Sequence, residues 1–266
     1  MRCLITIASM LIIFWNLPSI SQADLPLDKL ALYFSFEEGK GGTVTDLSPN
    51  GNNGEFQGKS GGGVKWVNNG KYGGAVEFHG VDNFILVKTS KSLEIETEVS
   101  ISVWINWNDA PGDGWLGILA NGKQGGPWEN YGLFVNRGGR YIYFTICLGA
   151  VGNHTTQNSG NNTTEPGKWQ HIVASYDGTV RIYVDGEKKF EQNKGQKLCA
   201  PGLDLEIGHR GGSTHFYNGL IDEVAIFEAG LTDAQVKEAS EWIQPMLAVY
   251  PQRKLTTTWG NLKNEY

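Results

Sequence analysis

The segment GKWQHIVASYDGTVRIYVDGE, residues 167–187, contains two Asp-Gly pairs, Asp177-Gly178 and Asp185-Gly186. Asp and Gly tolerate the positive φ angles that two-residue hairpin turns require. The stretch from 179 to 185 is too short for a globular helix and is rich in β-branched and aromatic residues. This segment predicts antiparallel strands joined by tight turns, and the rest of the chain must supply a sheet that such a ribbon can join.

Stretches of the same character recur along the chain, separated by glycine-rich turns. They are residues 30–36, 75–78, 84–87, 100–107, 117–120, 131–135, 141–148, 169–176, 179–185, 203–207 and 219–227. The chain has 36 glycines in 266 residues, about twice the usual share. No helical pattern lies between the strands, which favours antiparallel pairing over parallel βαβ units. In residues 99–107 apolar side chains alternate with mostly polar ones, as in a sandwich strand with one face in the core.

One helix is expected near the C-terminal end. Thr232 and Gln235 fit a capping box, in which the two side chains satisfy free backbone N–H groups at the start of a helix. Val236, Ala239 and Ile243 follow at helical spacing, and a proline at position 245 ends the run.

The two ends of the chain differ from this pattern. Arg2, an apolar run from 4 to 15 and the small residues ending at Ala23 have the order of a cleavable secretory signal. The run is shorter than the ~20 apolar residues that span a membrane. We therefore predict a signal peptide at 1–23, a domain at 24–250 and a polar tail at 251–266, which is either mobile or a short docking peptide. A secreted or extracellular protein follows, periplasmic if the source is a Gram-negative bacterium.

Net charge and cysteine content bear on the expected partners and on the disulfide. The formal net charge of −6 becomes −7 once Arg2 is removed, and without a basic stripe nucleic acid is not an expected partner. Cys3 leaves with the signal, so Cys147 and Cys199 remain. In an exported protein an isolated pair favours a disulfide, and two separate buried thiols are the alternative.

Four segments, taken together, carry a family resemblance. They are LYFSFEEGKGGTVTDLSPNGNNG (32–54), KYGGAVEFHGVDNFILV (71–87), WQHIVASYDGTVRIYVDGE (169–187) and FYNGLIDEVAIFEAGLT (216–232). In this order they resemble laminin G-like jelly-roll domains of the concanavalin A-like lectin/glucanase superfamily, over nearly all of residues 30–243. The resemblance implies an all-β, two-sheet antiparallel jelly-roll sandwich with one short C-terminal helix. It implies glycan binding, protein adhesion or, in some relatives, glycoside cleavage, and fold alone does not choose among them.

Catalysis in this superfamily would need paired carboxylates on one strand, one as nucleophile and one as acid/base. Glu94, Glu96 and Glu98 have that spacing, but they precede the apolar strand at 99–107. We therefore expect them to lie at a solvent-exposed edge. Asp204 and Glu206 are also two residues apart and lack a third partner. His171, which alternates within a strand, reads as a structural side chain. We therefore expect no enzyme; the alternative is a glycoside hydrolase or polysaccharide lyase with a divergent site.

The resemblance also implies a structural calcium ion. Superfamily members that bind one take a ligand from an acidic residue near the final strand and others from the N-terminal region. The matching residues are Asp222, Glu38 and Asp46, whose carboxylate oxygens suit calcium. The alternative is that Glu38 and Asp46 cap turns.

Glycan recognition needs flat aromatic faces for sugar C–H surfaces, with polar groups nearby for the hydroxyls. The candidate ligand-binding residues lie in one long loop and in others expected at the same rim: Trp115, Trp128, Asn130, Tyr131, His154, Arg210 and Tyr217. Each alone could be packing, Trp115 in particular. N-glycosylation sequons at Asn153, Asn161 and Asn162 indicate that 149–167 is an exposed loop. The leading hypothesis is a secreted, non-catalytic module that recognises extracellular carbohydrate or glycoprotein; a structural adhesion protein is a further alternative.

Overall fold

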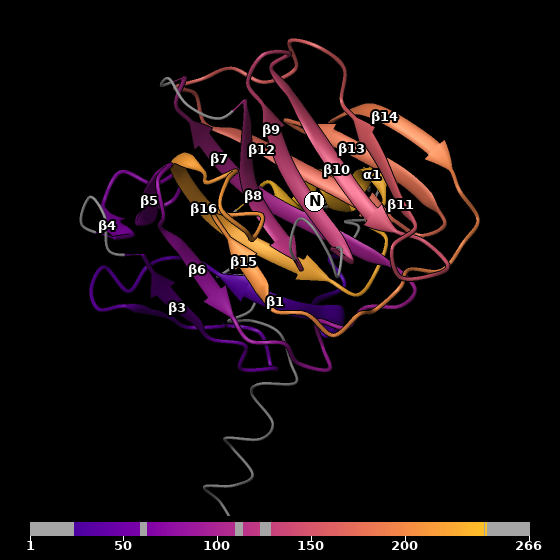
Figure 1. The fold of residues 1–266 in the computed structure, drawn as a ribbon, viewed down its shortest axis with the longest axis horizontal. Coiled ribbons are helices and arrows are strands. Elements are labelled where there is room, and N and C mark those ends of the chain that lie inside the picture. Colours follow the sequence, from indigo (N-terminus) through magenta and orange to yellow (C-terminus); the bar gives the residue numbers. More distant parts are fainter. Residues whose placement is uncertain (1–23, 59–62, 110–113, 123–128, 242, 244–266) are drawn as a thin grey trace, which may run out of the picture.

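A computed structural model describes residues 24–58, 63–109, 114–122, 129–241 and 243. Two antiparallel sheets of eight strands each form a sandwich, so the predicted all-β jelly-roll architecture is confirmed (Figure 1). The predicted signal peptide, the tail and Trp128 lie outside the described residues. No helix in the described part of the chain is long and apolar enough to cross a membrane.

The first sheet, called sheet A, has the order β14-β13-β12-β7-β16-β5-β4, with β1 paired to β16. Its strands are β1 (Leu30–Phe34), β4 (Lys65–Val67), β5 (Ala75–His79), β7 (Val99–Trp107), β12 (Gln170–Tyr176), β13 (Thr179–Val184), β14 (Glu187–Asn193) and β16 (Asn218–Phe227). The second sheet, called sheet B, has the order β11-β10-β9-β8-β15-β6-β3-β2. Its strands are β2 (Thr43–Val44), β3 (Gly54–Gln57), β6 (Phe84–Val87), β8 (Trp115–Asn121), β9 (Tyr131–Asn136), β10 (Tyr141–Cys147), β11 (His154–Asn158) and β15 (Leu205–Ile207).

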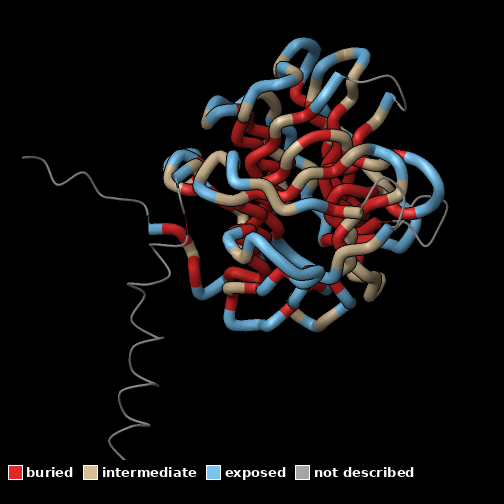
Figure 2. The backbone as a smooth tube through the Cα atoms, turned by 90° about the vertical axis from the view of Figure 1, so that its left-hand side faces the viewer, coloured by how far each residue is buried: buried red, intermediate tan, exposed pale blue. Residues whose placement is uncertain are grey.

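The main core fills the space between the sheets, and the surrounding loops carry most of the exposed residues (Figure 2). The alternation predicted for β7 is confirmed, since Val99, Ile101, Val103 and Ile105 all belong to this core. Trp107 joins them and is completely buried. Burial of this kind is the main stabilising contribution to a sandwich of two sheets.

A second, smaller core covers the outer face of sheet A. Helix α1 (Asp233–Ala239) and the 3₁₀ helix η1 (Leu27–Lys29) pack there against side chains from β1, β12, β13 and β16. The predicted capping box is confirmed: Thr232 accepts the Gln235 N–H, and the Gln235 side chain accepts the Thr232 N–H. The outer face of sheet A is therefore covered by the chain itself.

The opening ribbon forms β12, β13 and β14, but its two turns differ. Val184 pairs with Glu187, so Asp185-Gly186 is a two-residue turn, and both residues have positive φ, 52° and 76°. Tyr176 pairs with Val180, so the turn at Asp177-Gly178 has three residues rather than the two predicted. Both lengths are common in hairpins.

Several strands were not predicted from the sequence: β2, β3, β4, β11 and β14. The stretch 149–167 was expected to be an exposed loop, yet it contains β11, which pairs antiparallel with β10 from Tyr143↔Asn158 to Cys147↔His154. Its sequence, HTTQN, is polar on both faces because β11 is the edge strand of sheet B. The end of β10 also carries the disulfide: Cys147 and Cys199 are bonded, with Cα atoms 5.4 Å apart, which confirms the predicted pair.

Candidate functional site

The outer face of sheet B carries a group of aromatic side chains on β8, β9 and β10. Along β10, Ile142, Phe144 and Ile146 point into the core, so Tyr141 and Tyr143 point outward by strand alternation. Strand register places Trp115 of β8 and Tyr141 of β10 on either side of Asn136 in β9. The sheet therefore brings these outward side chains together.

The aromatic rings contact one another edge to face. The Trp115 ring centroid lies 4.9 Å from that of Tyr143 and 6.2 Å from that of Tyr141, at interplanar angles of 68° and 76°. Phe134 of β9 lies 6.3 Å from Tyr143. Trp115, Tyr141 and Tyr143 are half-buried, whereas Phe134 is buried. These four residues are called the aromatic strip.

Arg210 extends over the strip from the loop that follows β15. This loop lies against Gly117 of β8, where an added Cβ would come within 2.8 Å of the Arg210 backbone nitrogen. The Arg210 guanidinium carbon lies 4.7 Å from the Phe134 ring centroid, an arrangement that attracts a cation to an aromatic face. Glycine at 117 is required for the loop to approach the sheet this closely.

A buried carboxylate holds Arg210 in place. Arg210 Nε donates to Glu129 Oε1 at 2.5 Å, and Glu129 is completely buried. Its Oε2 atom is buried and has no hydrogen-bond partner among the described residues. His154 of β11 contacts the backbone of the same residue: its Nε2 lies 3.0 Å from the Glu129 carbonyl oxygen. Of the predicted ligand-binding residues, the structure thus brings Trp115, His154 and Arg210 to one face.

Three other predicted residues are not on that face. Tyr131 and Tyr217 are completely buried in the main core, and so is the side chain of Asn130. The Tyr131 hydroxyl donates to the Leu93 carbonyl at 3.3 Å, and Asn130 Nδ2 donates to the Ile95 carbonyl at 2.9 Å. Burial raises the pKa of Tyr131 far above its usual value. These three residues belong to the packed interior, where their side-chain donors bond to backbone carbonyls.

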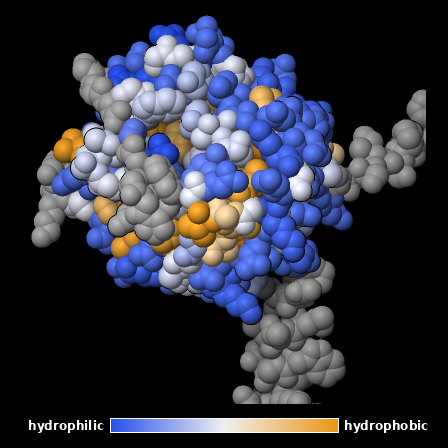
Figure 3. Space-filling model, turned by 45° about the vertical axis from the view of Figure 1, so that its right-hand side comes forward, coloured by the Kyte–Doolittle hydropathy of each residue, from blue (hydrophilic) through white to orange (hydrophobic). Residues whose placement is uncertain are grey.

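Sequence reasoning missed Phe134, Tyr141 and Tyr143. The available signal was the alternation in YIYFTIC, where tyrosines and a threonine share one face and Ile142, Phe144 and Ile146 share the other. This pattern places two half-exposed tyrosines on the face opposite the core. Seen from the side that carries β11 and β14 in Figure 1, the molecular surface is mostly hydrophilic with small apolar areas (Figure 3).

Asp46, one of the predicted calcium ligands, is saturated by hydrogen-bond donors. Its Oδ1 accepts the Tyr33 N–H at 2.9 Å, and its Oδ2 accepts the Asn52 N–H at 2.7 Å. The Ser48 backbone and hydroxyl also donate to this carboxylate. Donors surround Asp46 as they surround a carboxylate that organises a turn, which is the alternative that the sequence left open.

The other two predicted ligands have similar partners. Asp222 Oδ2 accepts the Tyr72 N–H at 3.0 Å, and Glu38 Oε1 accepts the Thr45 N–H at 2.7 Å. Burial raises the pKa of Asp222 to about 7. Among the described residues, no group of three acidic, histidine or cysteine side chains is placed to hold a metal ion. The calcium site stays a prediction, and these residues do not fit it as a shared ligand set.

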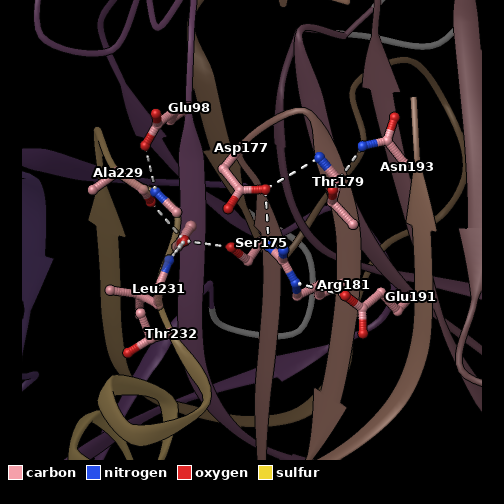
Figure 4. A network of polar contacts seen from close by, with 12 residues as sticks. Glu98, Ser175, Asp177, Thr179, Arg181, Glu191, Asn193, Ala229, Leu231 and Thr232 are labelled. Carbon is pink, nitrogen blue, oxygen red and sulfur yellow. Dashed lines mark hydrogen bonds and ion pairs between the residues drawn. The ribbon is translucent and has the colours of Figure 1, made fainter. Parts of the chain in front are cut away.

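The acidic residues weighed as catalysts lie mainly outside the strands. Glu94, Glu96 and Glu98 are exposed and lie outside any strand. Glu98 Oε2 accepts the Gly230 N–H at 3.0 Å, in the network that Figure 4 shows beside the start of α1. Asp204 pairs with Lys88 at 3.1 Å. Glu98 and Asp204 therefore have structural partners.

A charged hollow of about 270 Å³ lies next to that network, between β13, β14 and α1. Arg181 pairs with Asp177 at 2.9 Å and with Glu191 at 3.3 Å. Lys188 pairs with Glu191 at 2.8 Å and with Asp233 at 3.4 Å. Every charged residue of this hollow has a partner of opposite sign, and the pair between Lys188 and Asp233 joins β14 to the start of α1.

His171 lies on the covered outer face of sheet A, in agreement with a structural role. Its Nε2 is 2.8 Å from Ser102 Oγ, and its ring centroid is 5.2 Å from that of Trp104. Burial, with a smaller effect of Lys71, lowers the pKa of His171 to about 3.

Comparison with known proteins identifies relatives of this fold. Residues 79–237, more than half of the chain, match the model of a laminin G family described as "Concanavalin A-like lectin/glucanases superfamily". The adhesion G-protein coupled receptor V1 of Danio rerio is 22% identical over 151 residues, which are 54% of this chain and 2% of the receptor. This chain therefore corresponds to a small part of that receptor's length.

Solved structures show the same fold at low sequence identity. Domain 4 of AbnA, a GH43 extracellular arabinanase from Geobacillus stearothermophilus solved in complex with arabinotriose, is 21% identical, with a TM-score of 0.56; the match covers 80% of this chain and 98% of that one. The binding domain of Paraclostridial Mosquitocidal Protein 1 is 15% identical with a TM-score of 0.63, covering 80% and 52%. The botulinum neurotoxin serotype G binding domain is 16% identical with a TM-score of 0.62, covering 81% and 51%.

Proposed function

Because this chain belongs to a laminin G family of the concanavalin A-like lectin/glucanase superfamily, we propose that it is a secreted, non-catalytic module that binds extracellular carbohydrate. The carbohydrate can be free or part of a glycoprotein, and the aromatic strip on sheet B is the proposed binding face. The observation that carries this proposal is the set of half-buried rings of Trp115, Tyr141 and Tyr143, in edge-to-face contact on an outer sheet face.

The chemistry of the face suits a sugar. Aromatic faces pack against the C–H surfaces of a sugar ring, and nearby polar groups bind its hydroxyls. Arg210 commits its Nε–H to Glu129, which leaves terminal N–H groups of the guanidinium for a ligand. The ion pair also fixes Arg210 before a ligand arrives, so binding would cost little ordering of this side chain.

Other observations support parts of the proposal. The similar structures include a domain in complex with arabinotriose and two toxin binding domains, which supports a binding role. The exposed positions of Glu94, Glu96 and Glu98 outside any strand support a non-catalytic role. The signal-like first 23 residues support secretion.

The test is binding by the purified mature protein, residues 24–266, on a glycan array, followed by calorimetry with the oligosaccharides that are retained. We expect Trp115→Ala and Tyr143→Ala each to weaken binding about fivefold or more, since one aromatic contact is worth about 1 kcal/mol or more. Trp169→Ala, which removes a half-buried tryptophan before β12 in sheet A, is the matched control and should bind normally. Silence on every glycan, or equal binding by all variants, would refute the proposal.

The enzymatic alternative has its own readout. Reducing-sugar release from polysaccharides, lost on Glu96→Gln or Glu98→Gln, would replace the binding proposal with a hydrolase.

A further inference from the structure

An open hollow lies at the edge of sheet A, away from the aromatic strip of sheet B. It has a volume of about 350 Å³ and is lined by Gly39, Trp66, Val67, Asn68 and Asn69. Trp66 and Val67 belong to β4, the edge strand of sheet A, which Figure 1 shows on the left side, opposite β10 and β11. Nothing in the proposed binding face uses these residues.

Trp66 is held rigidly in the wall of this hollow. Its Nε1–H donates to the Gly41 carbonyl at 2.8 Å. Its ring centroid lies 5.0 Å from that of Phe56 and 6.4 Å from that of Phe36. The indole is half-buried, whereas Phe36 is completely buried. A ring fixed by a hydrogen bond and two neighbouring rings is a preorganised surface, which loses little entropy when a ligand packs on it.

The two asparagines supply the polar part of the site. Asn68 and Asn69 are exposed and follow β4 directly. A primary amide offers both a carbonyl acceptor and two N–H donors, which is the combination that pairs with hydroxyl groups. None of the lining residues carries a charge, so the hollow favours a neutral ligand over a uronic or sialic acid.

Size restricts the ligand further. Small-molecule sites usually measure about 300–1,000 Å³, and this hollow lies near the lower limit. An aromatic wall, two amides, no charge and this volume match one or two rings of a neutral sugar.

We propose that the hollow formed by Trp66, Asn68 and Asn69 is a second carbohydrate-binding site, for a neutral pentose or hexose unit. The domain then has two sites on different sheets and can bind a branched or polymeric glycan at two points. Two weak sites on one rigid domain raise the effective affinity for a polymer without any new contact. The inference stands on the residues of the hollow and does not depend on the aromatic strip.

The test is a nuclear magnetic resonance titration of ¹⁵N-labelled protein with the methyl glycosides of glucose, galactose, mannose and arabinose. We expect at least one glycoside to shift the indole N–H of Trp66 and the side-chain amides of Asn68 and Asn69. The dissociation constant for a single ring should be on the order of 1 mM or weaker. Trp66→Leu, which keeps apolar packing against Phe56, should lose these shifts.

A second variant guards against a folding artefact. Asn68→Ala with Asn69→Ala removes only exposed side chains, so the folded spectrum should be retained while the glycoside shifts weaken at least fivefold. Trp115→Ala is the matched control and should keep the Trp66 shifts. If none of the four glycosides shifts Trp66, Asn68 or Asn69, the second site is refuted, whatever the aromatic strip binds. Shifts at Trp66 with none at Trp115 or Tyr143 support the second site and count against the proposed binding face.

Discussion

The ion pair between Glu129 and Arg210 offers a direct test of how the binding face is anchored. Glu129 has no exposed surface, and its Oε1 accepts the Arg210 Nε–H at 2.5 Å, while its Oε2 has no hydrogen-bond partner among the described residues. The Arg210 side chain is 18% exposed. Arg210→Gln removes the cation that compensates the buried carboxylate. Breaking a buried pair from one side costs about 3–5 kcal/mol, so we expect the free energy of unfolding to fall by about 3 kcal/mol or more.

A double-mutant cycle separates this charge effect from lost packing on Phe134. Glu129→Gln keeps the shape of the side chain and leaves Arg210 at the edge of solvent, so its cost should be smaller, about 1–2 kcal/mol. The double variant, Glu129→Gln with Arg210→Gln, buries no charge. We therefore expect a coupling energy of about 2 kcal/mol between the two positions.

The measurement is urea unfolding at neutral pH, monitored by tryptophan fluorescence. The free energies of unfolding of variants are compared where the dependence on urea concentration has the same slope. Lys88→Gln is the matched control, because Lys88 pairs with Asp204 at 3.1 Å but its side chain is 75% exposed; it should change stability by less than about 1 kcal/mol. A loss below about 1 kcal/mol for Arg210→Gln, or additivity of the single variants within about 0.5 kcal/mol, would refute the argument that Arg210 compensates the buried charge.

Three further predictions concern the scaffold. The Cys147–Cys199 bond spans 52 residues, so Cys147→Ser with Cys199→Ser should lower the free energy of unfolding by about 4 kcal/mol; an unchanged thermal midpoint with and without reductant would contradict this. Asp46→Asn should lower the free energy of unfolding by about 1–3 kcal/mol, equally in calcium and in chelator. A larger loss in calcium than in chelator would support Asp46 as a calcium ligand. Burial lowers the pKa of His171 to about 3, so the unfolded chain binds more protons below its ordinary value of about 6.5, and stability falls as pH falls through that window. Relative to His171→Gln, the wild-type protein should lose about 2 kcal/mol between about pH 7 and about pH 5, and parallel pH profiles would contradict this.

The parts of the fold that the sequence predicted are those where local chemistry and packing agree. Asp185-Gly186 needs two positive φ angles and lies between strands, and Thr232 with Gln235 forms its cap from neighbouring residues. The edge strands β11 and β14 were missed because both of their faces are largely polar. Such strands form because of the strands they pair with, which are distant in sequence. Their own residue pattern does not predict them.

The candidate site was predicted in part. Trp115, His154 and Arg210 meet at one face, but no local pattern could show that the loop after β15 lies against Gly117. Tyr131 was assigned to the surface because it lies at the end of a loop rich in aromatic and polar residues. It is the first residue of β9, and its side chain points into the core. Aromatic residues were counted as a set, and the strand alternation that separates core rings from outward rings was not applied to them.

The two outer faces of the sandwich show why alternation matters here. On sheet A the outward side chains Val173 and Tyr183 pack under the segment 24–30 and α1, so their burial explains their size. On sheet B the outward rings of Tyr141 and Tyr143 remain half-buried, and within the described residues neither helix packs on that face. A large ring at such a position gains only part of the stabilisation that full burial gives. The proposed function assigns such a ring, beside Trp115 and a fixed guanidinium, to ligand binding, and this contrast between the two faces is the reason to search for the ligand on sheet B first.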